Sequence, residues 1–318
     1  DSDGWLEWFK RAWAFNPARG PLPDLHADYP ELFDESGKPL YNTNWQDAAT
    51  RTSFTNRHFL SLTQGTKKSK SGLFLGYQDE RGIMRDTYFN KYSVRYTNEV
   101  NLRSWLTVGG ELGYNQTKTN RLDDWRMGGE TPTRTMLDML PIFPVKYPDG
   151  RWSRLTDFGY NFNPDGSYYK SGIFPAENPV RSLKEVSNIY HYDRLLLNLY
   201  TNIKLAEGLE WKTTYASQIF SGKNNIWAGI DNVSYSAAVS GWAEVNQSRN
   251  VYWQTENYLS YDKSIANDHH VNAVLGASWM KSSDESLGGT AFGFSTDYFK
   301  YNNLSAGSIV IAPRSNFY

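Results

Sequence analysis

The sequence predicts an all-β protein: an antiparallel transmembrane β-barrel with short turns at one rim and long loops at the other. Two observations lead to this fold class. Apolar and polar residues alternate over long stretches, and the links between these stretches are alternately short and long. Composition is a third observation, because aromatic residues make up 16% of 318 residues although the mean hydropathy is only −0.64. Strands with one apolar and one wet face would have this composition.

Helical patterns are few. Residues 5–13 carry apolar side chains at helical spacing, which predicts a short amphipathic helix. A second short helix is expected over 135–140, ended by Pro141. Residues 1–57 are therefore interpreted as a loop segment associated with the barrel on its extracellular side, with a short helix.

The alternating stretches are long enough to cross a membrane. Tyr92, Val94 and Tyr96, for example, alternate with polar residues such as Arg95. Most of these stretches have about 9–14 residues, whereas a tilted membrane strand needs about 9–11. Strands are predicted at 58–65, 72–79, 89–102, 105–118, 187–205, 209–222, 249–262 and 269–283.

The links between these strands segregate by length. In an up-and-down sheet alternate links lie at the same end, so the short links, near 66–71, 103–104, 206–208 and 263–268, would share one rim. Long outer loops near 119–186 and 223–248, with a shorter one near 80–88, would share the other rim. Outer-membrane barrels have this asymmetry. Residues 58–318 are therefore assigned to the barrel strands and their loops.

The two faces of the strands should differ as lipid and water do. Three basic residues fall on the polar face, namely Arg95, Lys204 and Lys212. Each would cost about 2–4 kcal/mol if it faced lipid at mid-bilayer. Aromatic girdles are expected at both rims: Trp211 and Tyr261 by the short turns, Phe89 and Trp279 opposite them, with Trp105 on the polar face as an exception.

Charge and cysteine content exclude other classes. Lys and Arg number 33 against 34 Asp and Glu, so the net charge of −1 gives no general attraction to nucleic acid. The absence of cysteine excludes disulfides and cysteine metal sites. The chain begins at Asp1 without a leader pattern, and we expect it to be a piece of a longer protein.

An ordered series of short motifs resembles a known family. It begins with NTNWQD at 42–47 and continues through Arg51-Thr52, HFLSL at 58–62, LGY at 75–77 and KYSVR at 91–95. Weaker similarity follows, including Glu177-Asn178-Pro179 and the strand over 194–205. The series resembles the SusC/RagA-type TonB-linked outer-membrane transporters of Bacteroidetes. Ala49-Thr50 departs from the aromatic residue that the family usually carries there.

The resemblance implies a fold and a function. The family barrel has 22 strands, so this chain would be its central portion, without the plug domain, the TonB-contact segment or the C-terminal strands. It implies TonB-dependent import of large nutrients, oligosaccharides or peptides, across the outer membrane. It also implies a SusD-like surface lipoprotein and the TonB complex as partners, and no enzymatic activity.

Aromatic residues in the long links are the candidate substrate contacts. Flat rings next to Asn, Asp and Arg suit sugar binding, and they equally suit packing or contact with a partner protein. The candidates are Trp125, Trp152, Tyr168, Tyr169, Trp227, Tyr235 and Trp242.

No cofactor, metal or catalytic residue is expected. His269-His270 lacks the partners of a metal site. Residues 161–166 partly resemble a calcium loop, but Gly172 stands where the loop needs Glu. Two alternatives remain open from the sequence: a soluble or surface-exposed β-rich glycan-binding module, and an ungated porin.

Overall fold

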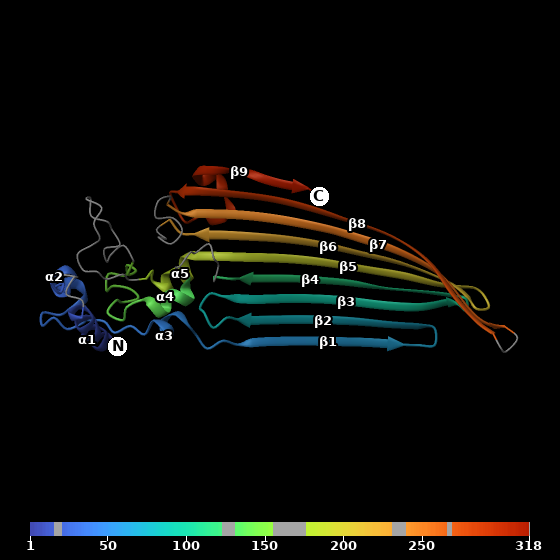
Figure 1. The fold of residues 1–318 in the computed structure, drawn as a ribbon, viewed down its shortest axis with the longest axis horizontal. Helices are drawn as coiled ribbons and strands as arrows, with labels where there is room; N and C mark the ends of the chain where they lie inside the picture. Colours follow the sequence, from blue (N-terminus) through green and yellow to red (C-terminus); the bar gives the residue numbers. More distant parts are fainter. Residues whose placement is uncertain (16–20, 123–130, 155–175, 231–239, 266–268, 318) are drawn as a thin grey trace.

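The computed structural model describes residues 1–15, 21–122, 131–154, 176–230, 240–265 and 269–317. Nine strands form one antiparallel sheet in the order of the sequence, β1 to β9 (Figure 1). The strands are β1 (Thr55–Gly65), β2 (Ser69–Arg81), β3 (Tyr88–Arg103), β4 (Leu106–Asn120), β5 (Val186–Ala206), β6 (Leu209–Ala228), β7 (Trp242–Ile265), β8 (His269–Phe294) and β9 (Gly307–Phe317). The sheet is open, with β1 and β9 at its edges.

The links confirm the predicted alternation of short and long. Short turns join β1 to β2, β3 to β4, β5 to β6 and β7 to β8 at one end of the sheet. The longer links lie at the other end, where the helices gather (Figure 1). Several strands are longer than predicted, and β9 was not predicted. β6 continues to Ala228 and β7 begins at Trp242, so the expected loop near 223–248 is shorter.

The register sorts the side chains into two faces. One row of directly paired residues crosses seven strands: Leu60, Leu75, Val94, Tyr114, Leu195, Ile219 and Val251. Another row belongs to the opposite face: Thr63, Gly72, Thr97, Glu111, Asn198, Ala216 and Gln254. We call these the apolar face and the polar face.

The predicted positions of the charged residues agree with this division. Arg95 lies on the polar face, where its guanidinium carbon is 4.4 Å from the centre of the Phe74 ring and a nitrogen is 3.7 Å from Glu111. Phe89 has the same parity as Arg95 along β3, so its predicted place in a girdle on the apolar face is wrong. Trp279 has the parity of Leu275 on β8 and is 57% exposed on the apolar face.

Helices gather at the long-loop end. They are α1 (Ser2–Ala14), α2 (Leu25–Asp28), α3 (Trp45–Ala49), α4 (Pro132–Asp138) and α5 (Pro179–Glu185). α1 includes the helix predicted over 5–13, whereas α4 overlaps the helix predicted over 135–140 but begins three residues earlier and ends at Asp138. Among the described residues, no helix combines the length and the hydropathy needed to cross a membrane.

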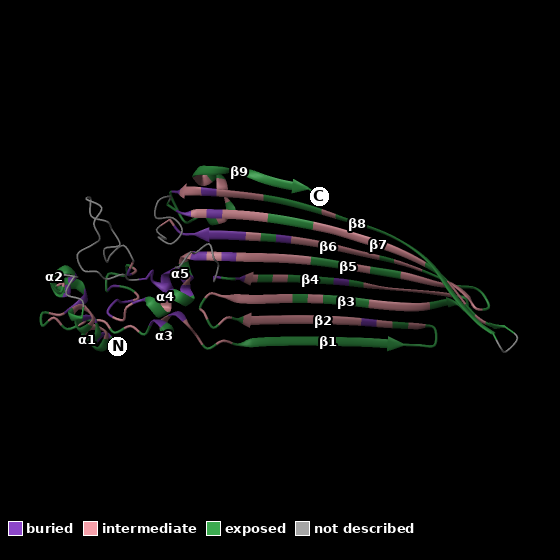
Figure 2. Ribbon diagram, viewed as in Figure 1, coloured by how far each residue is buried: buried purple, intermediate pink, exposed green. Residues whose placement is uncertain are grey.

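These helices share a core, and we call them with their connecting segments the helical cap (residues 2–15, 21–54, 131–153 and 176–185). Buried residues of the cap include Phe9, Trp45, Phe143 and Leu183. Trp45 donates from Nε1 to the carbonyl of Leu140 at 2.9 Å, which joins two segments far apart in the sequence. Burial is concentrated here and at the neighbouring strand ends, whereas the strands themselves are half-buried or exposed (Figure 2). The described strands share one small buried apolar cluster, formed by Trp227, Ala243, Ala291 and Phe294.

Gly109 makes room for an aromatic ring on the polar face. A Cβ atom on Gly109 would lie 2.3 Å from Tyr200 Cζ, and the Tyr200 hydroxyl donates to Glu99. We expect Gly109→Ala to lower the free energy of unfolding by about 1–3 kcal/mol, because the ring must shift. Urea unfolding in detergent would measure this. In a double mutant with Tyr200→Ala the two losses should not add, and full additivity would contradict this explanation.

Candidate functional site

Three aromatic rings form a row on the polar face of β5 and β6. Tyr190 and Tyr192 are two residues apart on β5, with ring centres 5.7 Å apart and planes inclined by 28°. Phe220 on β6 continues the row, 5.6 Å from Tyr192 and again at 28°. All three residues are half-buried. We call them the ring row.

Two residues of the ring row, Tyr190 and Tyr192, line a hollow in the polar face. The hollow has a volume of about 570 Å³ and extends from β5 across to β9. Its polar lining includes Asn224, Glu244, Asn246, Ser248 and Arg314. Gly222 pairs with Tyr192, and a Cβ there would lie 3.2 Å from the Tyr192 ring. Because Gly222 has no side chain, the hollow stays open beside the Tyr192 ring.

Neighbouring contacts hold these polar side chains in place. The Asn224 amide donates to the Asn188 side-chain oxygen at 2.7 Å. The Asn246 amide donates to Glu244 Oε1. The Arg121 guanidinium lies 6.0 Å from the centre of the Tyr190 ring. The hollow therefore combines flat rings, amides, a carboxylate and a guanidinium, a mixture typical of small-molecule sites.

A second hollow lies between the sheet and the helical cap. It has a volume of about 530 Å³, and its sheet side is lined by Glu80, Phe89 and Arg121. Pro132 and Leu183 of the cap line its other side. The cap therefore shapes access to the polar face at the long-loop end.

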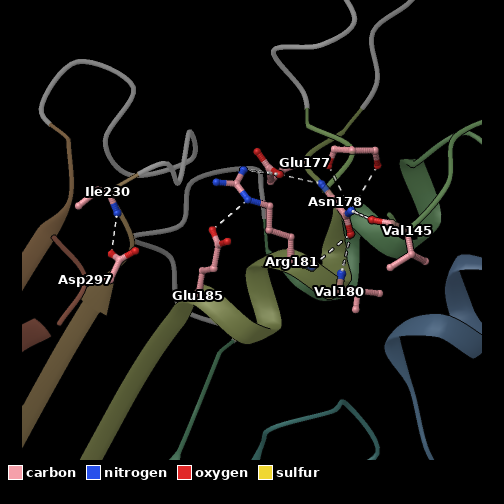
Figure 3. Close-up of polar contacts among 9 residues, drawn as sticks. Val145, Glu177, Asn178, Val180, Arg181, Glu185, Ile230 and Asp297 are labelled. Atoms are coloured by element: carbon pink, nitrogen blue, oxygen red, sulfur yellow. Dashed lines mark hydrogen bonds and ion pairs between the residues drawn. The ribbon is translucent and has the colours of Figure 1, made fainter. Parts of the chain in front are cut away.

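A buried ion-pair cluster anchors the last helix of the cap (Figure 3). Arg181 is fully buried and contacts two carboxylates, Glu177 at 3.2 Å and Glu185 at 2.9 Å. Asn178 caps α5 by accepting from the backbone N–H groups of Val180 and Arg181. Its amide also donates to the Val145 carbonyl at 2.9 Å. The Glu-Asn-Pro motif noted in the sequence thus has a structural role.

Burial raises the pKa of Glu177 to about 7, against the opposing effect of Arg181. A carboxyl whose pKa is raised on folding binds a proton in the cap that the unfolded segment releases between the two values. The stability of the cap should therefore fall as the pH rises from about 4.5 to about 7. Hydrogen exchange of α5 at pH 5 and pH 8 measures this, and Glu177→Gln should flatten the difference. If the difference in exchange between pH 5 and pH 8 were the same in both proteins, Glu177 would not be the titrating group.

The structure places only some of the candidate loop aromatics. Trp125, Tyr168, Tyr169 and Tyr235 lie outside the described residues. Trp152 is half-buried against the cap core, with the Lys146 ammonium 4.2 Å from the centre of its ring.

Two candidates were placed in a loop incorrectly. Trp227 belongs to β6, is 1% exposed and packs edge-on against Phe294, 4.9 Å between ring centres. Its ring therefore has no face available to a substrate. Trp242 begins β7 and lies 5.8 Å from the Phe292 ring centre. The sequence analysis did not identify the ring row. Its three residues lie on the polar face, whereas the strands were predicted from the residues of the apolar face.

The part of the chain that the structure describes contains no group of three or more potential metal ligands. His270 lies 3.6 Å from Asp262, a single pair near the β7–β8 turn. The calcium-like residues 161–166 are outside the described ranges.

The open antiparallel meander and its two unlike faces are those of a portion of a β-barrel. In solved structures the same fold occurs in the RagAB peptide transporter, with a TM-score of 0.69 and 22% identity, covering 93% of this chain and 32% of that chain. The RagAB peptide importer in its open-open state gives a TM-score of 0.71 at 20% identity, covering 93% and 33%. The predicted fold class is thereby confirmed.

Curated relatives confirm the family resemblance seen in the sequence. The chain is 24% identical over 297 residues to TonB-dependent receptor P3 of Formosa agariphila, covering 92% of this chain and 28% of that protein. It is 28% identical over 260 residues to TonB-dependent receptor SusC of Bacteroides thetaiotaomicron, covering 72% and 23%. No family model matches the chain. The chain is thus similar to SusC/RagA-like TonB-dependent transporters, and it spans about a quarter of the length of these curated relatives.

Proposed function

We propose that this chain is the central barrel portion of a TonB-dependent importer in the outer membrane. One observation supports this above others: an unbroken apolar row crosses seven strands on a face that nothing in the described chain covers. Leu60, Val94 and Leu199 are 50%, 44% and 48% exposed. Such a surface suits hydrocarbon and is unfavourable in water.

The imported material would be a large nutrient, either an oligosaccharide or a peptide. The lumenal face carries both aromatic and charged side chains, which suits passage of polar cargo. A SusD-like surface lipoprotein would act with the barrel at the long-loop end, and the TonB complex would supply energy through a segment outside this chain. We propose transport without a catalytic step.

A fractionation experiment tests the membrane location. The full-length protein should sediment with outer membranes, require detergent for extraction and migrate differently on gels before and after heating. Complete recovery in buffer without detergent would contradict the proposal and favour a soluble glycan-binding module.

Growth experiments test the import activity. A strain lacking the full-length gene should lose growth on at least one oligosaccharide or peptide mixture as sole carbon source. The gene supplied in trans should restore growth, but not in a strain without TonB. Restoration without TonB would instead indicate an ungated porin.

A further inference from the structure

We propose that three basic residues on the side of the sheet that faces lipid bind the phosphate group of a lipid in the outer leaflet of the membrane. They are Lys118 on β4, His191 on β5 and Lys223 on β6, and we call them the basic row. This inference rests on the proposed membrane location. It adds a lipid-binding site on the face opposite to the one that the cargo would pass.

Strand register brings the three residues together. Lys118 pairs directly with His191, and His191 pairs directly with Lys223. Directly paired residues have Cβ atoms about 4.5–5.5 Å apart, so the two lysines flank the imidazole. Both lysines interact electrostatically with the His191 ring, which agrees with this arrangement. Three groups that can donate to one phosphate therefore lie within reach of one another.

The basic row lies just beyond the apolar residues, towards the long-loop end. Each of its members has the parity of the apolar face and lies four residues beyond a member of the apolar row, as His191 lies from Leu195. Four residues extend about 13 Å along a strand, and a tilt of about 40° reduces this to about 10 Å across the membrane. The headgroup layer extends about 5–8 Å beyond the hydrocarbon. Lysine side chains can lean back over that distance.

The two lysines of the basic row are available to a ligand. Both residues are exposed. Among the described residues, the ion pairs that lysines form involve other lysines. The Lys118 ammonium lies 6.0 Å from the centre of the Tyr88 ring, a contact that uses none of its hydrogen-bond donors. A phosphate can therefore accept from both ammonium groups without displacing a carboxylate.

The neighbouring charges leave the basic row with a positive excess. Asp193 is the nearest acidic residue on the same face of β5, and it also interacts with the imidazole. Its carboxylate accepts from the Tyr114 hydroxyl at 2.5 Å and from the Gln116 amide at 3.1 Å. On β7, Arg249 has Glu285 opposite it, so that pair adds no net charge. Two lysines thus stand against one carboxylate.

A phosphorylated lipid suits this surface better than free phosphate. Its acyl chains would lie on the apolar face beside the basic row, where Leu195 and Leu199 are 38% and 48% exposed. Its phosphate would meet the lysines, so burial of apolar surface and charge attraction act together. Exposed lysines alone hold an anion only weakly in water. Phosphorylated lipid A, the anchor of the outer leaflet in outer membranes, has this chemistry.

Binding of lipid A to the full-length protein in detergent tests the proposal. Native mass spectrometry counts the bound lipids and gives dissociation constants for phosphorylated lipid A and for the same lipid without its phosphates. We expect the parent protein to prefer the phosphorylated form. The double variant Lys118→Gln/Lys223→Gln should bind that form about thirtyfold more weakly, since each lysine contributes about a factor of five beside an anionic headgroup.

The matched control is Lys204→Gln/Lys212→Gln, which removes two lysines from the polar face of β5 and β6. It should bind phosphorylated lipid A as the parent protein does, and heat-modifiable migration checks that both variants fold. The proposal is overturned if the two double variants bind alike, or if inorganic phosphate alone binds and displaces the lipid.

The comparison of the two lipids in the parent protein depends on no variant. Equal affinity for both forms would also overturn the proposal. In a protein that still needs detergent for extraction, that result would leave the membrane location intact. Recovery without detergent would instead contradict the proposed function itself.

Discussion

Leu197→Arg should prevent the barrel from forming in a lipid bilayer. Leu197 lies on the apolar face of β5, paired with Leu112 and Ser217. An arginine facing lipid at mid-bilayer costs about 2–4 kcal/mol. Folding of the full-length protein into lipid vesicles, followed by the heat-dependent shift in gel migration, measures the folded fraction. The fraction should fall severely in this variant.

The neighbouring residue supplies the control. Asn198→Arg adds the same charge on the polar face, opposite Glu111. Because this arginine would face the wet lumen and a carboxylate, the folded fraction should stay close to that of the parent protein. If both variants folded equally well, or if Asn198→Arg were the worse of the two, the assignment of faces would be wrong.

Arg181→Met should destabilise the helical cap while leaving the strands in place. The change leaves Glu177 and Glu185 without their shared cation, and Glu177 is fully buried. Breaking a buried ion pair by removing one partner costs about 3–5 kcal/mol. Limited proteolysis should cleave the cap near α5 much faster than in the parent protein, while the heat-modifiable migration of the barrel persists.

Lys184→Ala is the matched control on the same helix. Lys184 makes an ion pair with Asp86 at 2.9 Å, but its side chain is 53% exposed. Exposed pairs of this kind contribute about 0–1 kcal/mol, so cleavage should be nearly unchanged. Equal sensitivity in both variants would show that the buried cluster does not anchor the cap.

Period-two alternation predicted the strands wherever one face is apolar and the other wet. It failed where a strand continues past the segment that has one apolar and one wet face. At the end of β6, Ile226, Trp227 and Ala228 are all buried, so successive residues no longer differ in environment. The first residues of β7 are mainly polar, and the sequence there resembles a loop. Strand pairing with β6 and β8 determines the structure of this segment instead.

The helical cap and the ring row needed the three-dimensional structure. The contact between Trp45 and Leu140 joins segments separated by the first four strands, and no local pattern indicates it. Tyr190 and Tyr192 did leave a signal, two aromatic residues at period two on the face that carries Arg194. Reading the polar face for aromatic residues would have found them. Their proximity to Phe220 depends on the β5–β6 register.

Spin labels along β5 test most directly whether the apolar face contacts lipid. This chain has no cysteine, so single cysteines at consecutive positions from 194 to 203 can be labelled in full-length protein whose other cysteines have been replaced. In bilayers, labels at Leu195, Leu197 and Leu199 should be accessible to oxygen and shielded from a nickel chelate. Labels at Asn198 and Asn202 should show the reverse. Uniform accessibility along the strand, or the opposite alternation, would contradict the account.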